Sequence, residues 1–124
     1  MLTEWSAGES ESAEELAAYQ LALTVQEEDA GPVIEVKGGL VSGTAERLSA
    51  VVDELVEADA ELTIDLTRLA VLDSAGVGAL LSAAERADAA AARLRMLVSA
   101  PALDLLERTG VAAGVGRRAV IDLT

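Results

Sequence analysis

The pair Asp73 and Ser74 is the part of this chain best suited to chemistry, because it stands directly before a helical pattern. The apolar residues that follow repeat at i, i+3, i+4 and i+7, as Val77, Leu80, Leu81 and Ala84. A serine at the start of a helix lies beside free backbone N–H groups and the positive end of the helix dipole, and both favour an anion. We therefore expect the hydroxyl oxygen of Ser74 to be the functional atom of the chain.

A purely structural role for Ser74 is the main alternative. A serine before a helix can act as its N-cap, which is worth roughly 1 kcal/mol. Asp73 would cap the helix equally well, however, and each of Gly76 and Gly78 costs up to about 1 kcal/mol against alanine inside a helix. Glycines let another backbone or a partner approach closely. A helix start that gives up stability for access indicates a contact site.

Several catalytic and cofactor sites are excluded by residue type. The chain contains neither histidine nor cysteine, which removes the Ser-His-Asp triad and makes a zinc site implausible. The run Gly76-Val77-Gly78 begins like a dinucleotide-binding fingerprint, but Leu81 occupies the third glycine position. We predict no enzymatic activity, no metal and no cofactor. An enzyme that uses Ser74 as nucleophile, with Lys37 or a carboxylate as base, is the alternative from a different class.

The charge balance also limits the partners. Nine Lys and Arg residues against 22 Asp and Glu residues give a net charge of −13, whereas nucleic acids and anionic membranes require basic patches. No stretch approaches the roughly 18 consecutive apolar residues of a membrane span. The N-terminus is acidic and lacks the basic region of a signal peptide. We expect a cytoplasmic protein that binds neither nucleic acid nor membranes.

The chain divides into a short extension and one domain. Residues 1–18 contain Glu4, Glu9, Glu11, Glu14 and Glu15 and no basic residue. Their apolar content is too small to fold alone, so we expect an acidic, mobile extension, with a short helix over about 13–19 as the alternative. Residues 19–124 are long enough for one ordinary domain.

Hydrophobic periodicity predicts the elements of this domain. Strands are expected over 21–25, 33–37, 62–67, 94–98 and 119–123, and helices over about 44–58, 74–91 and 101–111, the last of which Gly110 can terminate. Residues 38–43 and 68–72 interrupt the pattern and are expected to be loops. The order β-β-α-β-α-β-α-β predicts an α/β fold in which an initial antiparallel hairpin joins parallel strands through right-handed crossovers.

Three segments resemble one protein family. They are Asp73-Ser74-Ala75-Gly76-Val77-Gly78 after an Ile-Asp-Leu strand, Gly38-Gly39-Leu40 followed by Thr44-Ala45, and Ser99-Ala100-Pro101 with Thr109-Gly110-Val111. Together with the element order, they resemble the STAS-domain anti-sigma factor antagonists over about residues 20–124. The resemblance implies a single STAS-like domain.

The resemblance also implies a partner-switching mechanism in bacterial transcription regulation. The unphosphorylated protein would bind an anti-sigma factor that is also an ATP-using serine kinase. Phosphorylation at Ser74 would then dissolve the complex, and a serine phosphatase would reset it. The partner-binding residues implied are Asp73, Ser74, Ala75, Gly76, Val77 and Gly78, together with Gly39, Leu40, Val41, Ser42 and Thr44.

One position departs from the family pattern. Many members have an acidic residue directly after Gly-x-Leu, and this chain has Val41 there. An acid at that place would help to shape the kinase-facing surface beside the serine. A STAS domain that is not phosphorylated, acting as a scaffold or a transport-system subunit, is therefore the alternative.

Trp5 is the one tryptophan of the chain, and it lies in the acidic extension, so its fluorescence reports on that extension. We expect it to emit as a solvated indole and to be quenched by iodide or acrylamide equally in the folded protein and in urea. Deletion of residues 1–18 is expected to leave the denaturant midpoint almost unchanged. A blue-shifted emission together with a less stable truncated protein would show instead that the extension packs on the domain.

Overall fold

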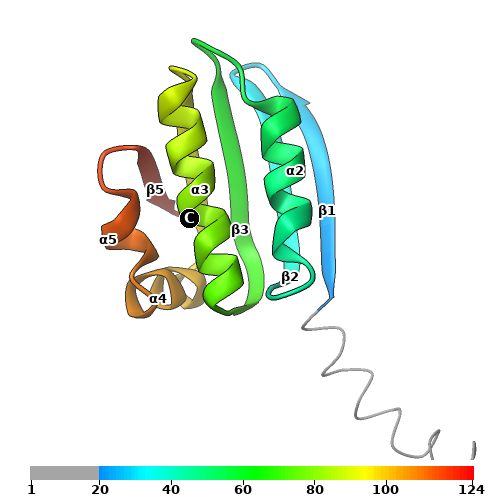
Figure 1. The fold of residues 1–124 in the computed structure, drawn as a ribbon, viewed down its shortest axis with the longest axis vertical. Coiled ribbons are helices and arrows are strands. Elements are labelled where there is room, and N and C mark those ends of the chain that lie inside the picture. Colours follow the sequence, from blue (N-terminus) through cyan, green and yellow to red (C-terminus); the bar gives the residue numbers. More distant parts are fainter. Residues whose placement is uncertain (1–19) are drawn as a thin grey trace, which may run out of the picture.

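The computed structural model describes residues 20–124, in which five strands form one mixed sheet in the order β1-β2-β3-β4-β5 (Figure 1). The strands are β1 (Leu21–Glu28), β2 (Gly31–Leu40), β3 (Glu61–Leu72), β4 (Arg93–Val98) and β5 (Ala119–Leu123). The helices are α2 (Ala45–Leu55), α3 (Ser74–Ala89), α4 (Ala100–Arg108) and α5 (Val111–Val115). The element order agrees with the predicted α/β class.

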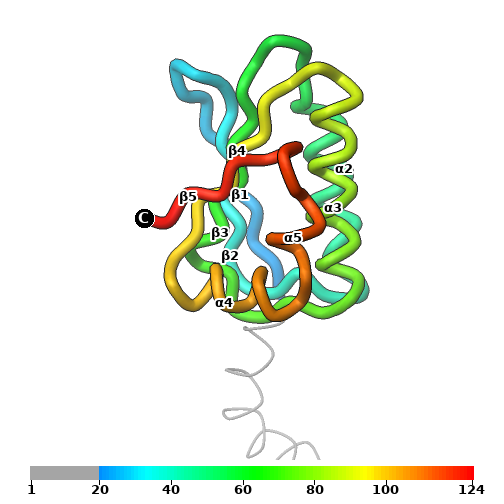
Figure 2. The backbone as a smooth tube through the Cα atoms, turned by 90° about the vertical axis from the view of Figure 1, so that its left-hand side faces the viewer, coloured from blue at the N-terminus to red at the C-terminus, as the bar shows by residue number. Residues whose placement is uncertain are grey.

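The strand directions determine where the strands end and where the following helices begin. β1 and β2 pair antiparallel as a hairpin, and every later pair, from β2–β3 to β4–β5, is parallel. The long helices α2 and α3 lie side by side on one face of the sheet (Figure 2). Because the connected strands are parallel, their carboxyl ends and the helix starts that follow them gather at one edge of the sheet.

The core lies between this face of the sheet and the helices. On β3 the predicted alternation holds in part: Leu62, Ile64 and Leu66 are buried and Asp65 and Thr67 are half-buried, but Thr63 is buried as well. The largest buried side chains are aliphatic, as expected for a chain with so few aromatic residues. Packing of these chains between sheet and helices supplies the main driving force for folding.

The loop expected over 68–72 belongs to β3, and the first three residues of the loop expected over 38–43 belong to β2. β2 continues through Leu40, and β3 continues through residues 68–72. The pairing of β2 with β3 shifts register between Glu35 and Lys37 and again between Gly38 and Gly39. Each shift is a bulge with one extra residue on β3, which moves the apolar residues off the two-residue period and explains why the sequence pattern was misleading.

The helix boundaries differ from the prediction for local reasons. α2 ends at Leu55 and not near residue 58, because Val56 is already extended. α3 ends at Ala89, and Ala91 adopts a left-handed conformation that closes its last turn. The predicted third helix is interrupted at Gly110, whose φ is 84°, so Val111 begins the separate helix α5.

The expectations for the acidic extension over 1–18 and for a helix over 13–19 lie outside the described residues. From residue 20 onwards, no helix has both the length and the apolar character needed to cross a membrane.

Candidate functional site

The candidate site lies at the carboxyl edge of the sheet, where β2 and β3 end and α2 and α3 begin (lower end of Figure 1). Two loops meet there, one after Leu40 and one at Asp73. The backbone N–H of Asp73 donates to the carbonyl oxygen of Leu40 at 3.2 Å, so the two loops are joined through the main chain.

The Asp73 side chain joins the same loops a second time. Its Oδ1 accepts hydrogen bonds from the backbone N–H groups of Ala75 (2.9 Å) and Gly76 (3.1 Å), and its Oδ2 accepts one from Ser42 (3.0 Å). These bonds, the one from Ser42 first, favour the charged carboxylate and lower the pKa of Asp73 below its usual value. Asp73 is therefore both the N-cap of α3 and the anchor of the Ser42 loop.

The arrangement around Ser74 corrects two expectations about the start of α3. We expected free N–H groups at this helix start, but Ala75, Gly76 and Val77 all donate to Asp73, the last to its carbonyl oxygen. The anion at this helix start is thus the Asp73 carboxylate. Asp73 is also the cap, so the alternative role of Ser74 as N-cap is wrong. Ser74 is the first residue of the helix and is exposed.

The two glycines of the first turn serve different purposes. A Cβ on Gly76 would lie well inside contact distance of the Leu40 carbonyl oxygen and 2.6 Å from Cδ1 of Leu72. Gly76 is therefore required for the close approach of α3 to the end of β2. A Cβ on Gly78 would meet nothing within 4 Å. Packing does not explain Gly78, which leaves open surface beside Ser74.

The loop from β2 to α2 is held by Thr44. Its hydroxyl donates to the carbonyl oxygen of Gly39 at 2.7 Å and accepts from the backbone N–H of Val41 at 3.0 Å. Gly43 takes a positive φ of 93° within this turn. Thr44 therefore shapes the turn that presents Ser42 and Gly43 to solvent.

The residues predicted to bind a partner fall into two groups. Gly39, Leu40, Val41 and Gly76 are buried, with Leu40 fully enclosed and Val41 only 9% exposed, so they form the support of the site. The others reach the surface wholly or in part: Ser42, Thr44, Asp73, Ser74, Ala75, Val77 and Gly78. The two sequence segments are thus brought together.

A shallow groove of about 590 Å³ runs between the first turns of α2 and α3, beside Ser74. It is lined by Ser42, Gly43, Ala45, Glu46, Ser49, Ala75, Gly78, Ala79 and Ser82. The sequence reasoning missed most of the helical lining. The sequence does contain a signal for this lining, because small residues recur there at helical spacing. They are Ala45 with Ser49, and Ala75 with Ala79 and Ser82.

The shape of the groove is suited to the binding of a partner. Its walls are short side chains and exposed backbone, and Glu46 is the one charged residue among those that line it. Within the part of the chain that the structure describes, no three acidic residues gather as metal ligands would. Short side chains allow the backbone of a partner to approach both helices closely.

Comparison with known proteins places this geometry in a family. A family model described as "Mlab, STAS domain" matches residues 23–122. An anti-sigma factor antagonist from Mycobacterium paratuberculosis has a similar structure, with 23% identity, a TM-score of 0.64, and coverage of 82% of this chain and 86% of that chain. No curated protein matches the chain significantly.

Two structures of SpoIIAA are also similar. The anti-sigma factor antagonist SpoIIAA in its unphosphorylated form is 19% identical with a TM-score of 0.58, over 83% of this chain and 88% of that chain. The Bacillus cell fate determinant SpoIIAA in its phosphorylated form has the same identity and TM-score, over 83% and 91%. At these identities the likeness shows the shared fold.

Gly76 and Gly78 offer a matched pair of substitutions. We expect Gly76→Ala to lower the free energy of unfolding by at least about 2 kcal/mol, because the new methyl group overlaps the Leu40 carbonyl. Gly78→Ala has free space and gains helix propensity, so it should raise the same free energy by up to about 1 kcal/mol. Urea unfolding of both variants tests this, and equal effects would contradict the separate roles.

The hydrogen bonds of Asp73 predict a pH dependence. Because folding lowers the pKa of Asp73, its stabilising effect is present above the unfolded value of about 3.9 and is lost as the pH falls through the folded value. Asp73→Asn should therefore be less stable than the native protein at pH 7, and the difference should shrink below about pH 4. Denaturant unfolding across this range measures it, and parallel curves would contradict it.

Proposed function

The chain belongs to the STAS domain family, and from this premise we propose that it is an anti-sigma factor antagonist controlled by phosphorylation at Ser74. The proposed partner is an anti-sigma factor that is also a serine kinase, with a serine phosphatase to reverse the modification. With such partners, the proposed location is the cytoplasm. The observation that carries this proposal is the exposure of Ser74, which directly precedes Ala75 in the lining of a groove with short side chains.

The hydroxyl of Ser74 is available to a kinase because the fold does not use it. Asp73 caps α3, and Ser74 makes no side-chain hydrogen bond to residues 20–124. Replacement or modification of the hydroxyl therefore removes no hydrogen bond within this part of the chain. The residue can change chemically while the domain keeps its structure.

A phosphate on Ser74 would act mainly on the partner. It would add about −1.5 to −2 charges. The N–H groups of Ala75, Gly76 and Val77 already donate to Asp73, so a phosphate on the exposed Ser74 side chain would project into solvent beside the groove. Asp73 and Glu46 already make this surface negative, and the added charge would repel carboxylates of the partner. The phosphate group would also occupy space in the contact area.

The two SpoIIAA structures support the same proposal. They describe an antagonist of this fold in an unphosphorylated and in a phosphorylated form. By analogy, the two forms of this chain would differ at Ser74 and share one fold. Binding would then be controlled by surface charge and not by a change of architecture.

A binding protein that is not phosphorylated is the second candidate function. The position after Gly-x-Leu is Val41, which is buried, so the kinase-facing surface has no carboxylate at this place. The description of the matching family model also names Mlab and does not name an antagonist. In this alternative the same groove would bind a protein permanently, as a scaffold or a transport-system subunit.

Incubation with the cognate anti-sigma kinase and ATP tests the proposal. We expect one phosphate, on Ser74, by intact-mass analysis and peptide mapping. Ser74→Asp should weaken binding to the kinase at least tenfold, about 1.4 kcal/mol, by calorimetry. Its denaturant midpoint should stay near that of the native protein, because Ser74 is exposed and is not the cap.

Two controls separate the switch from other effects. Ser74→Ala should bind the kinase normally and accept no phosphate. Ala100→Asp adds the same charge at the same position of α4, where Ser99 is the cap, and should bind normally. Phosphate found solely on Ser82 or Ser99, or equal binding by Ser74→Asp, would overturn the proposal. Stable binding without any phosphate would favour the scaffold.

A further inference from the structure

Within residues 20–124, the helices pack on one face of the sheet and leave the other face open. The cluster of core side chains contains residues from all four helices but from a single sheet face, among them Ile34 and Ile64. Successive side chains of a strand point to opposite faces, so the open face carries the residues between these core positions. On β2 and β3 they are Val33, Glu35 and Lys37, and Thr63, Asp65 and Arg68.

An open face is unusual for strands with these directions. β2, β3, β4 and β5 are parallel to one another, and sheets of parallel strands are usually covered on both faces. The centre of the open face is only partly polar, since Val33 and Leu97 are half-buried there and Thr63 is only 7% exposed. A second layer that covers this face is therefore expected.

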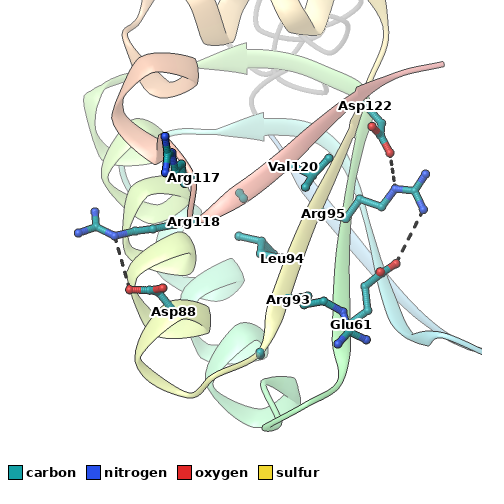
Figure 3. A pocket seen from close by; sticks show the side chains of 11 residues that line it. Glu61, Asp88, Arg93, Leu94, Arg95, Arg117, Arg118, Val120 and Asp122 are labelled. Carbon is teal, nitrogen blue, oxygen red and sulfur yellow. Dashed lines mark hydrogen bonds and ion pairs between the residues drawn. The ribbon is translucent and has the colours of Figure 1, made fainter.

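The charges on the β4 and β5 side of the open face have partners within the chain. Arg95 forms ion pairs with Asp122 and with Glu61, the latter at 3.8 Å (Figure 3). Arg93 lies directly opposite Glu61 in the pairing of β3 with β4. This part of the face therefore has acidic and basic side chains interspersed.

The β2 and β3 side of the open face has its charges sorted into two rows. Glu35 lies directly opposite Asp65, and one step further along the strands Lys37 lies directly opposite Arg68. Like charges directly opposite each other on neighbouring strands are unfavourable. The Asp65 carboxylate is fixed in its row, because its Oδ1 accepts hydrogen bonds from the backbone N–H (2.9 Å) and the hydroxyl (2.6 Å) of Thr67. An acidic row thus lies beside a basic row.

We infer that the open face binds the same face of a second copy of this chain. A half-turn about an axis that runs across the strands, between the two rows, places the acidic row of each copy over the basic row of the other. Glu35 then faces Lys37 of the second copy, and Asp65 faces Arg68. A two-fold interface requires a surface that is complementary to itself, and these two rows meet that requirement.

The packing of two such faces is compatible with known sheet geometry. The half-turn makes the strands of the two copies antiparallel, which is an aligned packing, and aligned sheets lie about 10 Å apart with interdigitated side chains. Val33 and Leu97 would be buried beside the ion pairs. Facing charges fix the register of an interface more than its strength, so we expect a specific dimer of moderate affinity.

The dimer would leave the candidate functional site free. The groove beside Ser74 lies between α2 and α3, which pack on the covered face of the sheet. Dimerisation and phosphorylation therefore use opposite sides of the domain. Failure of one proposal does not affect the other, because the kinase reaction and the oligomeric state are measured separately.

Sedimentation equilibrium of the full chain tests the inference. The measurement is made at about 0.15 M salt, where a Debye length of about 8 Å screens the repulsion between two chains of net charge −13. We expect a monomer–dimer equilibrium with a Kd at or below about 100 μM. Lys37→Glu and Glu35→Lys should each weaken it at least tenfold. They change the net charge in opposite directions, so a general charge effect cannot explain a loss in both.

Two further mixtures of charge test the facing of the rows directly. The double variant Glu35→Lys/Lys37→Glu should regain the native Kd, because opposite charges face each other again. An equimolar mixture of the two single variants should form a heterodimer for the same reason. Arg86→Glu and Glu85→Lys make the same charge changes on α3, which lies on the covered face, and both should dimerise like the native chain.

Three results would overturn the inference. The first is a native chain that stays monomeric at concentrations up to about tenfold above the expected Kd. The second is a dimer that both single variants form equally well, which would place the interface elsewhere. The third is a chain that dimerises only after deletion of residues 1–18, which would show that this acidic segment, and not a second copy, occupies the open face. Equal denaturant midpoints of the variants at low concentration exclude misfolding as the cause of a loss.

Discussion

The Asp73 carboxylate is the interaction on which the candidate site depends. One side chain accepts hydrogen bonds from the start of α3 and from Ser42, 31 residues earlier in the sequence. The contact is possible because Gly76 has no side chain to separate α3 from Leu40. A polar bridge and a missing side chain thus have the same effect, which is to fix two loops beside each other.

The fold was predictable from the sequence as far as its periodicity is regular. The strands with clean alternation and the helices with one apolar stripe were found, and so was their order, because burial on one face imposes these periods. The ends of β2 and β3 were not found. Two bulges shift the period there, and bulges arise from the pairing of strands, which a single segment does not reveal. Gly110 was recognised as a stop, but not as the start of α5.

The position of the candidate site could be predicted from the sequence, but the separate roles of its residues could not. The residue types at Asp73, Ser74, Gly76 and Gly78 indicated a contact surface, which the helix start between two loops is placed to form. The sequence could not tell which of Asp73 and Ser74 caps the helix, nor which glycine faces the β2 carbonyl, since both depend on where the neighbouring strand ends. The lining from α2 depends likewise on the packing of two helices that are distant in sequence.

The parallel arrangement also gives the two edges of the sheet different electrostatic characters. The starts of α3 and α4 lie at the carboxyl edge, where the helix dipoles favour the Asp73 carboxylate. The end of α3 lies at the amino edge, where its dipole favours cations, and Arg118 beside Asp88 fits this pattern. One dipole is worth typically 0.3–1 kcal/mol and falls off within about a turn. It therefore bears on Arg118 alone among the arginines of this edge, whereas Arg95 is held by the carboxylates of Asp122 and Glu61.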